Sequence, residues 1–467
     1  MNKNIVVVGG GLPGMITAYL VKKKFYDFKV YLIEKTNHLG GLYSSIDFEQ
    51  RYTFDIGMHL IYSCKNEYLN NFLKKTLYNK WNIFENVKKD IAGVFFNNNL
   101  NQKSPYLDLT NLSSNRLKKY KNKIYSLSKT NIKKLNKYKN LAEYFKSRFG
   151  NEIYTEVIGP IILKLWGIKG EMMHPLASKI VLMDRLILYK DSLNLSRILT
   201  NNNLRSRIGF PNQFSLPKKY YSNQKFALYP KEFGLKNVIN FFEKKLIKLD
   251  IKIFKNTDIE TAKISKNIIQ TLVVKKKNQL FEIKNISKLF WTSPIYSLNN
   301  LLDIRFKSKK INTREQVLVY FLLKSKPRMG KLYYFYCFEK GFNTFRVTNY
   351  YNYCRNSKLA NGFYSICVEL HFDNSNLKKD YEKIAISEML KMNIINKASI
   401  VSTFLVSKNS FPLLSVNNVN ALNKIRCLIL KKNIKNFYLC GQAPEKSIFF
   451  LHDILDQNFN LISRFKK

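Results

Sequence analysis

A glycine-rich turn near the start of the chain, within residues 4–14, constrains the fold more than any other feature. Four apolar residues, Ile5 to Val8, predict a buried parallel strand, and residues 15–24 predict a helix. Between them lies Gly9-x-Gly11-x-x-Gly14, and this strand–turn–helix order is typical of a dinucleotide-binding unit. Gly9 permits the tight turn, Gly11 lets the backbone approach a pyrophosphate, and Gly14 lets the helix pack close to the strand. The amino-terminal N–H groups of the helix are then expected to face the phosphates.

A carboxylate and a second glycine turn follow at informative positions. Residues 29–33 predict the next strand, which ends at Glu34, where a carboxylate can accept hydrogen bonds from ribose hydroxyls. The Gly40-Gly41 pair comes soon after, and residues 52–59 read Tyr-Thr-Phe-Asp-Ile-Gly-Met-His. A plain NAD dehydrogenase has no reason to carry this second turn so close to the ribose carboxylate.

These segments resemble the FAD-dependent superfamily that includes flavin amine oxidases, protoporphyrinogen oxidase, phytoene desaturase and UDP-galactopyranose mutase. The nearest similarity is to bacterial amine-oxidase-like proteins with a Phe-Asp-x-Gly-Met-His pattern. Further segments occur in the family's order and extend the resemblance over nearly the whole chain: 141–145, 149–150, 164–167, 229–235, 256–259, 289–294 and 436–442 followed by a helix around Asp453.

The resemblance implies where FAD would bind. The Gly40-Gly41 turn would lie beside the pyrophosphate and the ribityl chain, the Gly57-Met58-His59 segment would pass the isoalloxazine, and a backbone group near Ile259 would contact adenine. The helix around Asp453 would point its amino-terminal end at the flavin edge where negative charge gathers on reduction. The full set of expected FAD contacts is Gly9, Gly11, Leu12, Pro13, Gly14, Glu34, Lys35, Gly40, Gly41, Leu42, Gly57, Met58, His59, Ile259, Gly441 and Asp453.

The expected fold class is α/β, with a discontinuous Rossmann-like FAD-binding domain of the glutathione reductase-2 type. This domain is predicted to comprise residues 1–105, 215–300 and 405–467. Residues 106–214 predict a helical insertion, and residues 301–404 predict an antiparallel-sheet substrate domain. Four runs of period two predict strands in this last part, at 316–323, 331–338, 344–349 and 363–370.

The cysteines and the apolar runs bound the setting of the protein. Six cysteines are scattered without a C-x-x-C pair, which argues against a disulfide framework or a metal site and favours the cytoplasm. No apolar run is long enough for a membrane helix, and the early first strand leaves no room for a signal peptide.

The formal net charge is +47, which can indicate nucleic acid or an anionic membrane as a partner. The lysines are spread through the chain among Asn, Ile, Tyr and Phe, however, as a very A/T-rich coding sequence would produce. The densest basic stretch, 116–139, predicts a solvated helical face, with peripheral membrane contact as the alternative. No nucleic-acid-binding motif accompanies it, so we expect a small-molecule substrate and no nucleic acid; the oligomeric state is left open.

Two side chains are candidates for catalysis. His59 could donate to the flavin or move a substrate proton, or contribute only its backbone. Arg346 could clamp a carboxylate or phosphate, or pair with Glu369 on a neighbouring strand. Lys164 and Trp166 resemble a family feature between the insertion and the substrate pocket. Packing is the expected role of Trp166 and Tyr229, and burial that of Cys440.

Departures from the subfamilies shape the expected activity. The strand at 315–323 lacks the lysine that activates oxygen in amine oxidases, and 443–450 lacks a cysteine for covalent attachment, so non-covalent FAD is expected. Leu42 stands where UDP-galactopyranose mutases usually carry Asn. We expect a FAD-dependent oxidoreductase, an oxidase, dehydrogenase or desaturase, acting on a small or amphipathic substrate. The alternatives are a redox-neutral sugar-nucleotide mutase of surface polysaccharide metabolism, and a binding protein without turnover.

Overall fold

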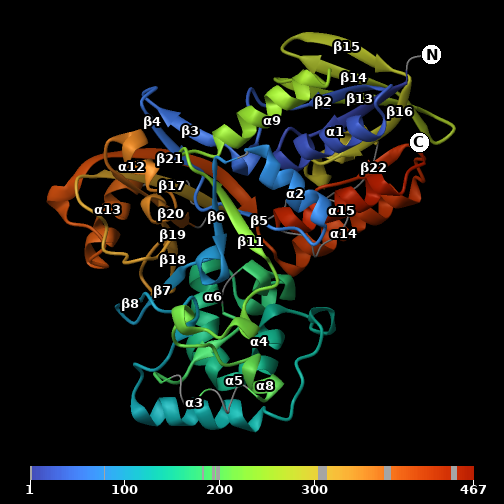
Figure 1. Ribbon diagram of the computed structural model, residues 1–467. Helices are drawn as coiled ribbons and strands as arrows, with labels where there is room; N and C mark the ends of the chain where they lie inside the picture. Colours follow the sequence, from blue (N-terminus) through green and yellow to red (C-terminus); the bar gives the residue numbers. More distant parts are fainter. Residues whose placement is uncertain are drawn as a thin grey trace.

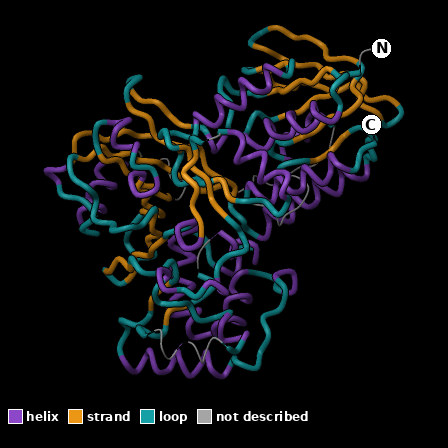
Figure 2. The backbone as a smooth tube through the Cα atoms, in the orientation of Figure 1, coloured by secondary structure: helices purple, strands orange, loops and turns teal. Residues whose placement is uncertain are grey.

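A computed structural model describes residues 3–77, 79–180, 183–191, 195, 200–302, 313–372, 380–442 and 450–466. Three parts are visible in Figure 1: a region with a parallel sheet near both termini, a region with a large mixed sheet, and a helical part below them. Figure 2 shows that the lower part consists mainly of helices, whereas the upper two combine strands with helices. The predicted α/β fold class is confirmed.

The parallel sheet has five strands in the order β12-β2-β1-β16-β22. Its strands are β1 (Asn4–Val8), β2 (Lys29–Ile33), β12 (Lys252–Phe254), β16 (Ile286–Trp291) and β22 (Phe437–Leu439). The connections lead from β1 outward to β2 and β12 on one side, and the chain then returns to β16 and β22 on the other side, so a topological switch point lies beside β1. In open α/β sheets, ligands bind in the crevice at such a switch point, outside the carboxyl ends of the strands.

The four consecutive apolar residues of β1 are explained by burial on both faces of the sheet. Ile5 and Val7 belong to the main hydrophobic core, on the side of α1 (Leu12–Lys24), which contacts α9 (Lys236–Lys248) and α15 (Leu451–Ser463). Val6 and Val8 belong to a second core with residues of β14 (Ile268–Lys276). Strand β14 lies between β13 (Thr257–Ser265) and β15 (Gln279–Lys284) in an antiparallel meander.

The second large sheet has seven strands in the order β21-β17-β20-β19-β18-β7-β8. The four strands predicted by period two are present in it, as β17 (Thr313–Leu323), β18 (Tyr334–Cys337), β19 (Thr344–Asn349) and β20 (Tyr364–Phe372). The other members are β7 (Ala92–Phe96), β8 (Asn99–Asn101) and β21 (Ile400–Pro412). Strands β7 and β8 come from the predicted first segment of the FAD domain, yet β7 pairs with β18 in this sheet.

Smaller sheets and short helices join the parts. Strands β3 (Ser45–Phe48) and β4 (Tyr52–Asp55) form a hairpin. Strands β5 (Ile61–Tyr62), β11 (Phe226–Pro230) and β6 (Trp81–Glu85) form a three-stranded sheet. Further helices are α2 (Glu67–Thr76), α10 (Leu298–Leu301), α11 (Tyr350–Tyr353), α12 (Asn356–Asn361), α13 (Tyr381–Lys391) and α14 (Val416–Lys431). Among the described residues, no helix is both long and apolar enough to cross a membrane.

The helical part is anchored to the large sheet by a half-buried lysine. Its helices include α3 (Ser114–Ser126), α4 (Leu141–Phe149), α5 (Asn151–Ile153), α6 (Gly159–Trp166) and α8 (Asn202–Arg205), with the short strands β9 (Leu107–Asp108) and β10 (Leu186–Ile187). The Lys164 ammonium donates to the backbone carbonyls of Cys337, at 2.5 Å, and Thr344. Burial lowers the pKa of Lys164. The lysine therefore holds α6 against two strands, and Trp166 is buried beside it, as predicted.

Candidate functional site

The two glycine turns predicted from the sequence contact each other. The Gly40 N–H donates to the Gly10 carbonyl at 2.8 Å, and the Leu12 N–H donates to the Gly40 carbonyl at 3.4 Å. Gly9 and Gly40 have positive φ angles of 105° and 100°, which glycine adopts without steric cost. The turn after β1 and the turn after Glu34 therefore form one continuous surface at the carboxyl end of the sheet.

Two glycines of the first turn serve different purposes. A Cβ atom at Gly14 would lie 1.9 Å from the Gly9 carbonyl oxygen, so this position is closed to any side chain. A Cβ atom at Gly11 would meet only the Pro13 ring, at 3.7 Å, and would otherwise point into open space. Gly14 thus serves helix packing, whereas Gly11 leaves space for a ligand to reach the backbone.

This surface fits the phosphates of a dinucleotide. Among the described residues, no hydrogen-bond acceptor is recorded for the backbone N–H groups of Gly11, Gly14 and Gly41. Pro13 lies in the first turn of α1, where its missing N–H costs no hydrogen bond. Unsatisfied N–H groups at a helix amino terminus attract anions.

Glu34 links the glycine turn to the predicted adenine segment. Its carboxylate accepts hydrogen bonds from the N–H groups of Gly10, at 2.6 Å, and Thr36, at 2.8 Å. Its backbone carbonyl accepts from the Thr257 N–H at 2.9 Å, at the start of β13. Ile259 lies two residues further along this strand, so the chain brings it close to the ribose carboxylate.

The closing segment lies against the first turn through small and polar contacts. Gly441 has φ +66°, and a Cβ atom there would lie 2.9 Å from the Thr292 carbonyl oxygen. Its N–H donates to Asn458 on α15 at 3.3 Å, and the Asn458 amide donates to Thr17 on α1 at 2.9 Å. Asp453 lies in the first turn of α15. Cys440 is buried, as predicted, and burial raises the pKa of its thiol to about 12.

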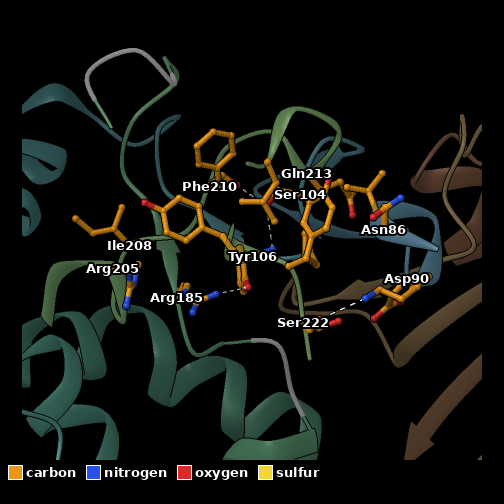
Figure 3. A pocket seen from close by; sticks show the side chains of 16 residues that line it. Asn86, Asp90, Ser104, Tyr106, Arg185, Arg205, Ile208, Phe210, Gln213 and Ser222 are labelled. Atoms are coloured by element: carbon orange, nitrogen blue, oxygen red, sulfur yellow. Dashed lines mark hydrogen bonds between the residues drawn. The ribbon is translucent and has the colours of Figure 1, made fainter. Parts of the chain in front are cut away.

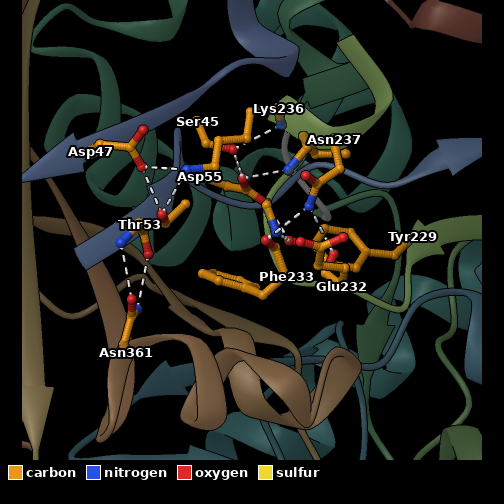
Figure 4. A network of polar contacts seen from close by, with 12 residues as sticks. Ser45, Asp47, Thr53, Asp55, Tyr229, Glu232, Phe233, Lys236, Asn237 and Asn361 are labelled. Atoms are coloured by element: carbon orange, nitrogen blue, oxygen red, sulfur yellow. Dashed lines mark hydrogen bonds and ion pairs between the residues drawn. The ribbon is translucent and has the colours of Figure 1, made fainter. Parts of the chain in front are cut away.

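Asp55 organises the segment that leads to the predicted flavin face (Figure 4). The buried carboxylate accepts from the Ser45 hydroxyl at 2.6 Å, from the Tyr229 hydroxyl, and from the Leu235 N–H at 2.9 Å. Its backbone carbonyl accepts from the Tyr350 hydroxyl at 2.6 Å. Desolvation raises the pKa of Asp55 even though these bonds oppose the shift. Asp55 therefore holds together the 52–59 segment, the segment after β11 and helix α11.

The residues after Asp55 lie between the second glycine turn and the large sheet. The rings of His59 and Tyr43 are 5.2 Å apart, and Tyr43 follows the Gly40-Gly41 turn. Gly57 has φ +69°, and a Cβ atom there would lie 2.8 Å from the Glu369 carboxylate and 3.2 Å from the Arg346 guanidinium. Only glycine therefore fits where this segment crosses the ion pair on the sheet.

Arg346 pairs with Glu369, the cross-strand partner considered in the sequence. The Arg346 Nε donates to Glu369 at 2.6 Å, and both side chains are largely buried. Gln316 donates to the second carboxylate oxygen at 2.9 Å. The charge of Glu369 raises the pKa of Arg346 although burial alone would lower it. Arg346 thus remains charged beside Gly57.

Asp90 is a site residue that the sequence does not predict. Its side chain is exposed and lines a cavity of about 400 Å³, yet desolvation raises the pKa of its carboxyl to about 6. The carboxyl group contacts solvent in the open cavity, while protein atoms surround it on its other sides. Tyr334 and the Arg346 charge lie near enough to oppose the shift, and the Asp90 charge raises the pKa of Tyr62.

The cavity extends from Asp90 into the helical part (Figure 3). In this view Asp90 lies at one end, Arg185 and Arg205 lie at the other, and Tyr106 lies between them. The site thus has a surface of backbone amides, a group of phenols and charges around Asp90 and Arg346, and a basic chamber beyond. None of Asp90, Arg185 and Arg205 lies in a motif or periodic run of the sequence, so sequence patterns did not point to them.

Two predictions fall outside the described residues. The prediction of non-covalent FAD rests on residues 443–450, and the structure describes only Phe450 among them. The predicted substrate domain includes residues 303–312 and 373–379, which are likewise outside the described residues.

Comparison with known families and proteins supports the fold. Residues 7–76 match the family model described as NAD(P)-binding Rossmann-like domain. The curated proteins contain no match to the chain.

Solved structures match over nearly the whole chain at low sequence identity. A reduced UDP-galactopyranose mutase aligns with a TM-score of 0.73 and 16% identity, over 99% of this chain and 95% of that one. A protein assigned as protoporphyrinogen oxidase from Exiguobacterium sp. 255-15 aligns with a TM-score of 0.67 and 16% identity, over 99% and 98%. A CLA-producing fatty acid isomerase from P. acnes aligns with a TM-score of 0.57 and 12% identity, over 99% and 98%. These matches confirm the fold that the resemblance implies.

Proposed function

We propose that this chain is a FAD-dependent oxidoreductase that binds its cofactor non-covalently along the two glycine turns. The observation that carries the proposal is the set of backbone N–H groups at Gly11, Gly14 and Gly41, which have no recorded acceptor among the described residues, at the carboxyl end of β1. Oriented N–H groups at a helix amino terminus are suited to a pyrophosphate. The matched family model supports a dinucleotide there, and the second glycine turn favours FAD over NAD.

Each predicted contact has a role in this arrangement. Leu12 and Pro13 continue the turn that would hold the phosphates, and Glu34, with Lys35 beside it, would bind the ribose hydroxyls. The backbone at Ile259 would contact adenine, and Leu42 follows the second turn. Met58 and His59 would line the flavin, and Gly441 and the helix that carries Asp453 would lie at its far edge. FAD would supply electron transfer to or from the substrate.

The substrate lies between Gly57 and the group around Asp90. Arg346, fixed by Glu369, orients a negative or polar group of the substrate. The carboxyl of Asp90 holds or takes up a proton at its oxygen, because its pKa of about 6 leaves both forms accessible near neutral pH. The side chains of Tyr334 and Tyr336 are buried and limit water at this point.

A redox-neutral reaction is the second candidate. It is favoured by the match to a UDP-galactopyranose mutase over 99% of the chain. The two candidates differ in electron balance, because a mutase needs no external electron acceptor or donor to return its flavin to the starting state.

Anaerobic assays separate the candidates. The purified holoprotein is reduced with dithionite and offered UDP-sugars, and the oxidised holoprotein is offered amines, amino acids and unsaturated lipids. Bleaching of the flavin absorbance by one substrate class supports an oxidoreductase. Isomerisation of a UDP-sugar without net flavin oxidation supports the mutase and refutes the first proposal.

A further inference from the structure

The helical part contains a basic chamber that the proposed redox chemistry does not require. The chamber is the end of the cavity away from Asp90, where Arg185, Arg205 and Tyr106 lie (Figure 3). Tyr220 also lines the cavity and lies against Arg205. Arg185 directly precedes β10, and Arg205 is the last residue of α8. Both side chains are partly buried. A cavity of about 400 Å³ falls within the size range of small-molecule sites.

The arginines of the helical part fall into two groups. Arg207 is fully buried, and its donors reach the backbone carbonyls of Arg148, Asn203 and Thr130 at 2.7 to 2.9 Å. Arg148 likewise donates to the backbone carbonyls of Asp184, at 2.6 Å, and Ser206. These two guanidinium groups use their hydrogen-bond donors within the fold and have few donors available for a ligand.

The two chamber arginines are held differently. Arg185 donates to the Tyr106 hydroxyl at 2.8 Å and lies 5.5 Å from the centre of that ring. Arg205 lies 5.7 Å from the centre of the Tyr220 ring. Within the described part of the chain, no carboxylate forms an ion pair with either guanidinium. The remaining cation at the cavity, Lys89, donates to the backbone carbonyls of Ser222 and Gln224 and is already satisfied.

We propose that the chamber binds a phosphate or diphosphate ester. Two partly buried guanidinium groups without carboxylate partners favour an anion, because a bound anion offsets their lost hydration. A single carboxylate satisfies one guanidinium fork, whereas a diphosphate carries enough charge and oxygen acceptors for both. The tyrosine rings, held against the arginines, present flat walls to the rest of the ligand.

This subsite deepens the proposed function. It rests on that function only for the position of the substrate's reacting end. If the reacting end of the substrate lies by Asp90 and Arg346, the phosphate end occupies the chamber, and the substrate is an elongated phosphorylated molecule. The chamber then selects substrates by their phosphate group, and Asp90 acts at the other end.

The test is isothermal titration of inorganic pyrophosphate into the FAD-saturated protein, so that the glycine turns are already filled. Wild type is compared with Arg185→Gln, Arg205→Gln, the double variant, and Arg464→Gln, which removes the same charge at the surface of the FAD region. Malonate serves as the carboxylate probe, and thermal unfolding checks that each variant is folded. Arg205→Lys keeps the charge but lacks the planar fork.

Each single chamber variant is expected to weaken pyrophosphate binding about tenfold and the double variant about a hundredfold, with Arg464→Gln unchanged. Arg205→Lys should fall between wild type and Arg205→Gln. Unchanged binding in the double variant, or no binding to folded wild type, overturns the subsite while leaving FAD binding intact. Malonate binding as tight as pyrophosphate overturns the phosphate assignment. If the wild-type protein takes up no FAD when the cofactor is supplied, yet binds pyrophosphate through Arg185 and Arg205, the proposed function is refuted and the subsite is kept.

Discussion

The proposed dinucleotide end and the proposed substrate end of the site are built from different kinds of atoms. At the glycine turns, backbone N–H groups are available to the proposed ligand. The missing side chain at Gly11 leaves space for that ligand, and the missing side chain at Gly14 lets the helix pack. Around Asp90 and Arg346, side chains from the large sheet, the β6–β7 connection and the helical part meet. The first surface depends on residues adjacent in sequence, whereas the second exists only after distant segments fold together.

The difference predicts opposite responses to substitution. Substitutions at the dinucleotide end should act through steric clashes. Substitutions at the substrate end should act by leaving a charged group without its partner. The following changes test this comparison, beginning with the largest expected effect.

Gly14→Ala should be the most disruptive change, because its Cβ would lie 1.9 Å from the Gly9 carbonyl oxygen. We expect a loss of about 3 kcal/mol or more in the free energy of unfolding, measured by urea denaturation. Gly11→Ala is the matched control in the same turn and should unfold at nearly the wild-type urea concentration. Equal stability of the two variants would contradict the packing role of Gly14.

Arg346→Met should destabilise the sheet by about 3 kcal/mol, because it leaves the Glu369 carboxylate buried without its ion-pair partner. The double variant Arg346→Met/Glu369→Met should recover most of this loss, since both charges are gone. Chemical denaturation of the four proteins gives the coupling energy. If Arg346→Met were as stable as wild type, Arg346 would not be held by Glu369.

Asp90→Asn should change the pH dependence of stability. The folded state raises the pKa of Asp90 to about 6, so it favours the protonated carboxyl relative to the unfolded chain. Wild type should therefore lose stability relative to Asp90→Asn as pH rises from about 4 to about 6, by about 1 kcal/mol after allowance for solvent contact. The difference should level off above about pH 7, where the Asp90 carboxyl is ionised in both the folded and the unfolded state. Urea unfolding at several pH values measures it, and a pH-independent difference would exclude the raised pKa.

Asp258→Asn should have the smallest effect. The Lys35–Asp258 pair is 2.7 Å apart, but the side chains are 76% and 50% exposed. Exposed pairs contribute about 0.5 kcal/mol or less, so thermal unfolding should be nearly unchanged. A large loss would indicate that the rim of the adenine segment depends on charge, unlike the rest of the dinucleotide end.

The sequence is informative for the fold because periodic apolar runs and glycine turns are local signals. The strand at 29–33 and the strand at 344–349 are predicted with the bounds that the structure has. The contact between the two glycine turns can also be predicted from the sequence, because both turns follow strands that end at the same edge of the sheet. The helix after the first turn begins at Leu12 rather than Met15, since Pro13 is compatible with a first helical turn.

The substrate end could not be predicted in the same way. Asp90 stands after a lysine pair in an ordinary connection, and only the pairing of β7 with β18 places the carboxyl near Tyr334 and Arg346. Arg185 and Arg205 are separated from Asp90 by a hundred residues or so and meet it through the insertion. Asp55 lies within the 52–59 segment, but its hydrogen-bond partners Ser45, Tyr229 and Leu235 lie in three separate segments.

The central claim is that the glycine turns bind FAD through exposed backbone amides. Its most direct measurement is the flavin content of the purified protein, from the visible absorbance spectrum and from the nucleotide released on denaturation. We predict one FAD per wild-type chain, and a colourless Gly11→Val variant that unfolds cooperatively near the wild-type temperature, because its side chain fills the phosphate space without touching the core. A Gly11→Val protein that retains its full flavin content, or a wild type that binds no FAD when the cofactor is supplied, would contradict the account.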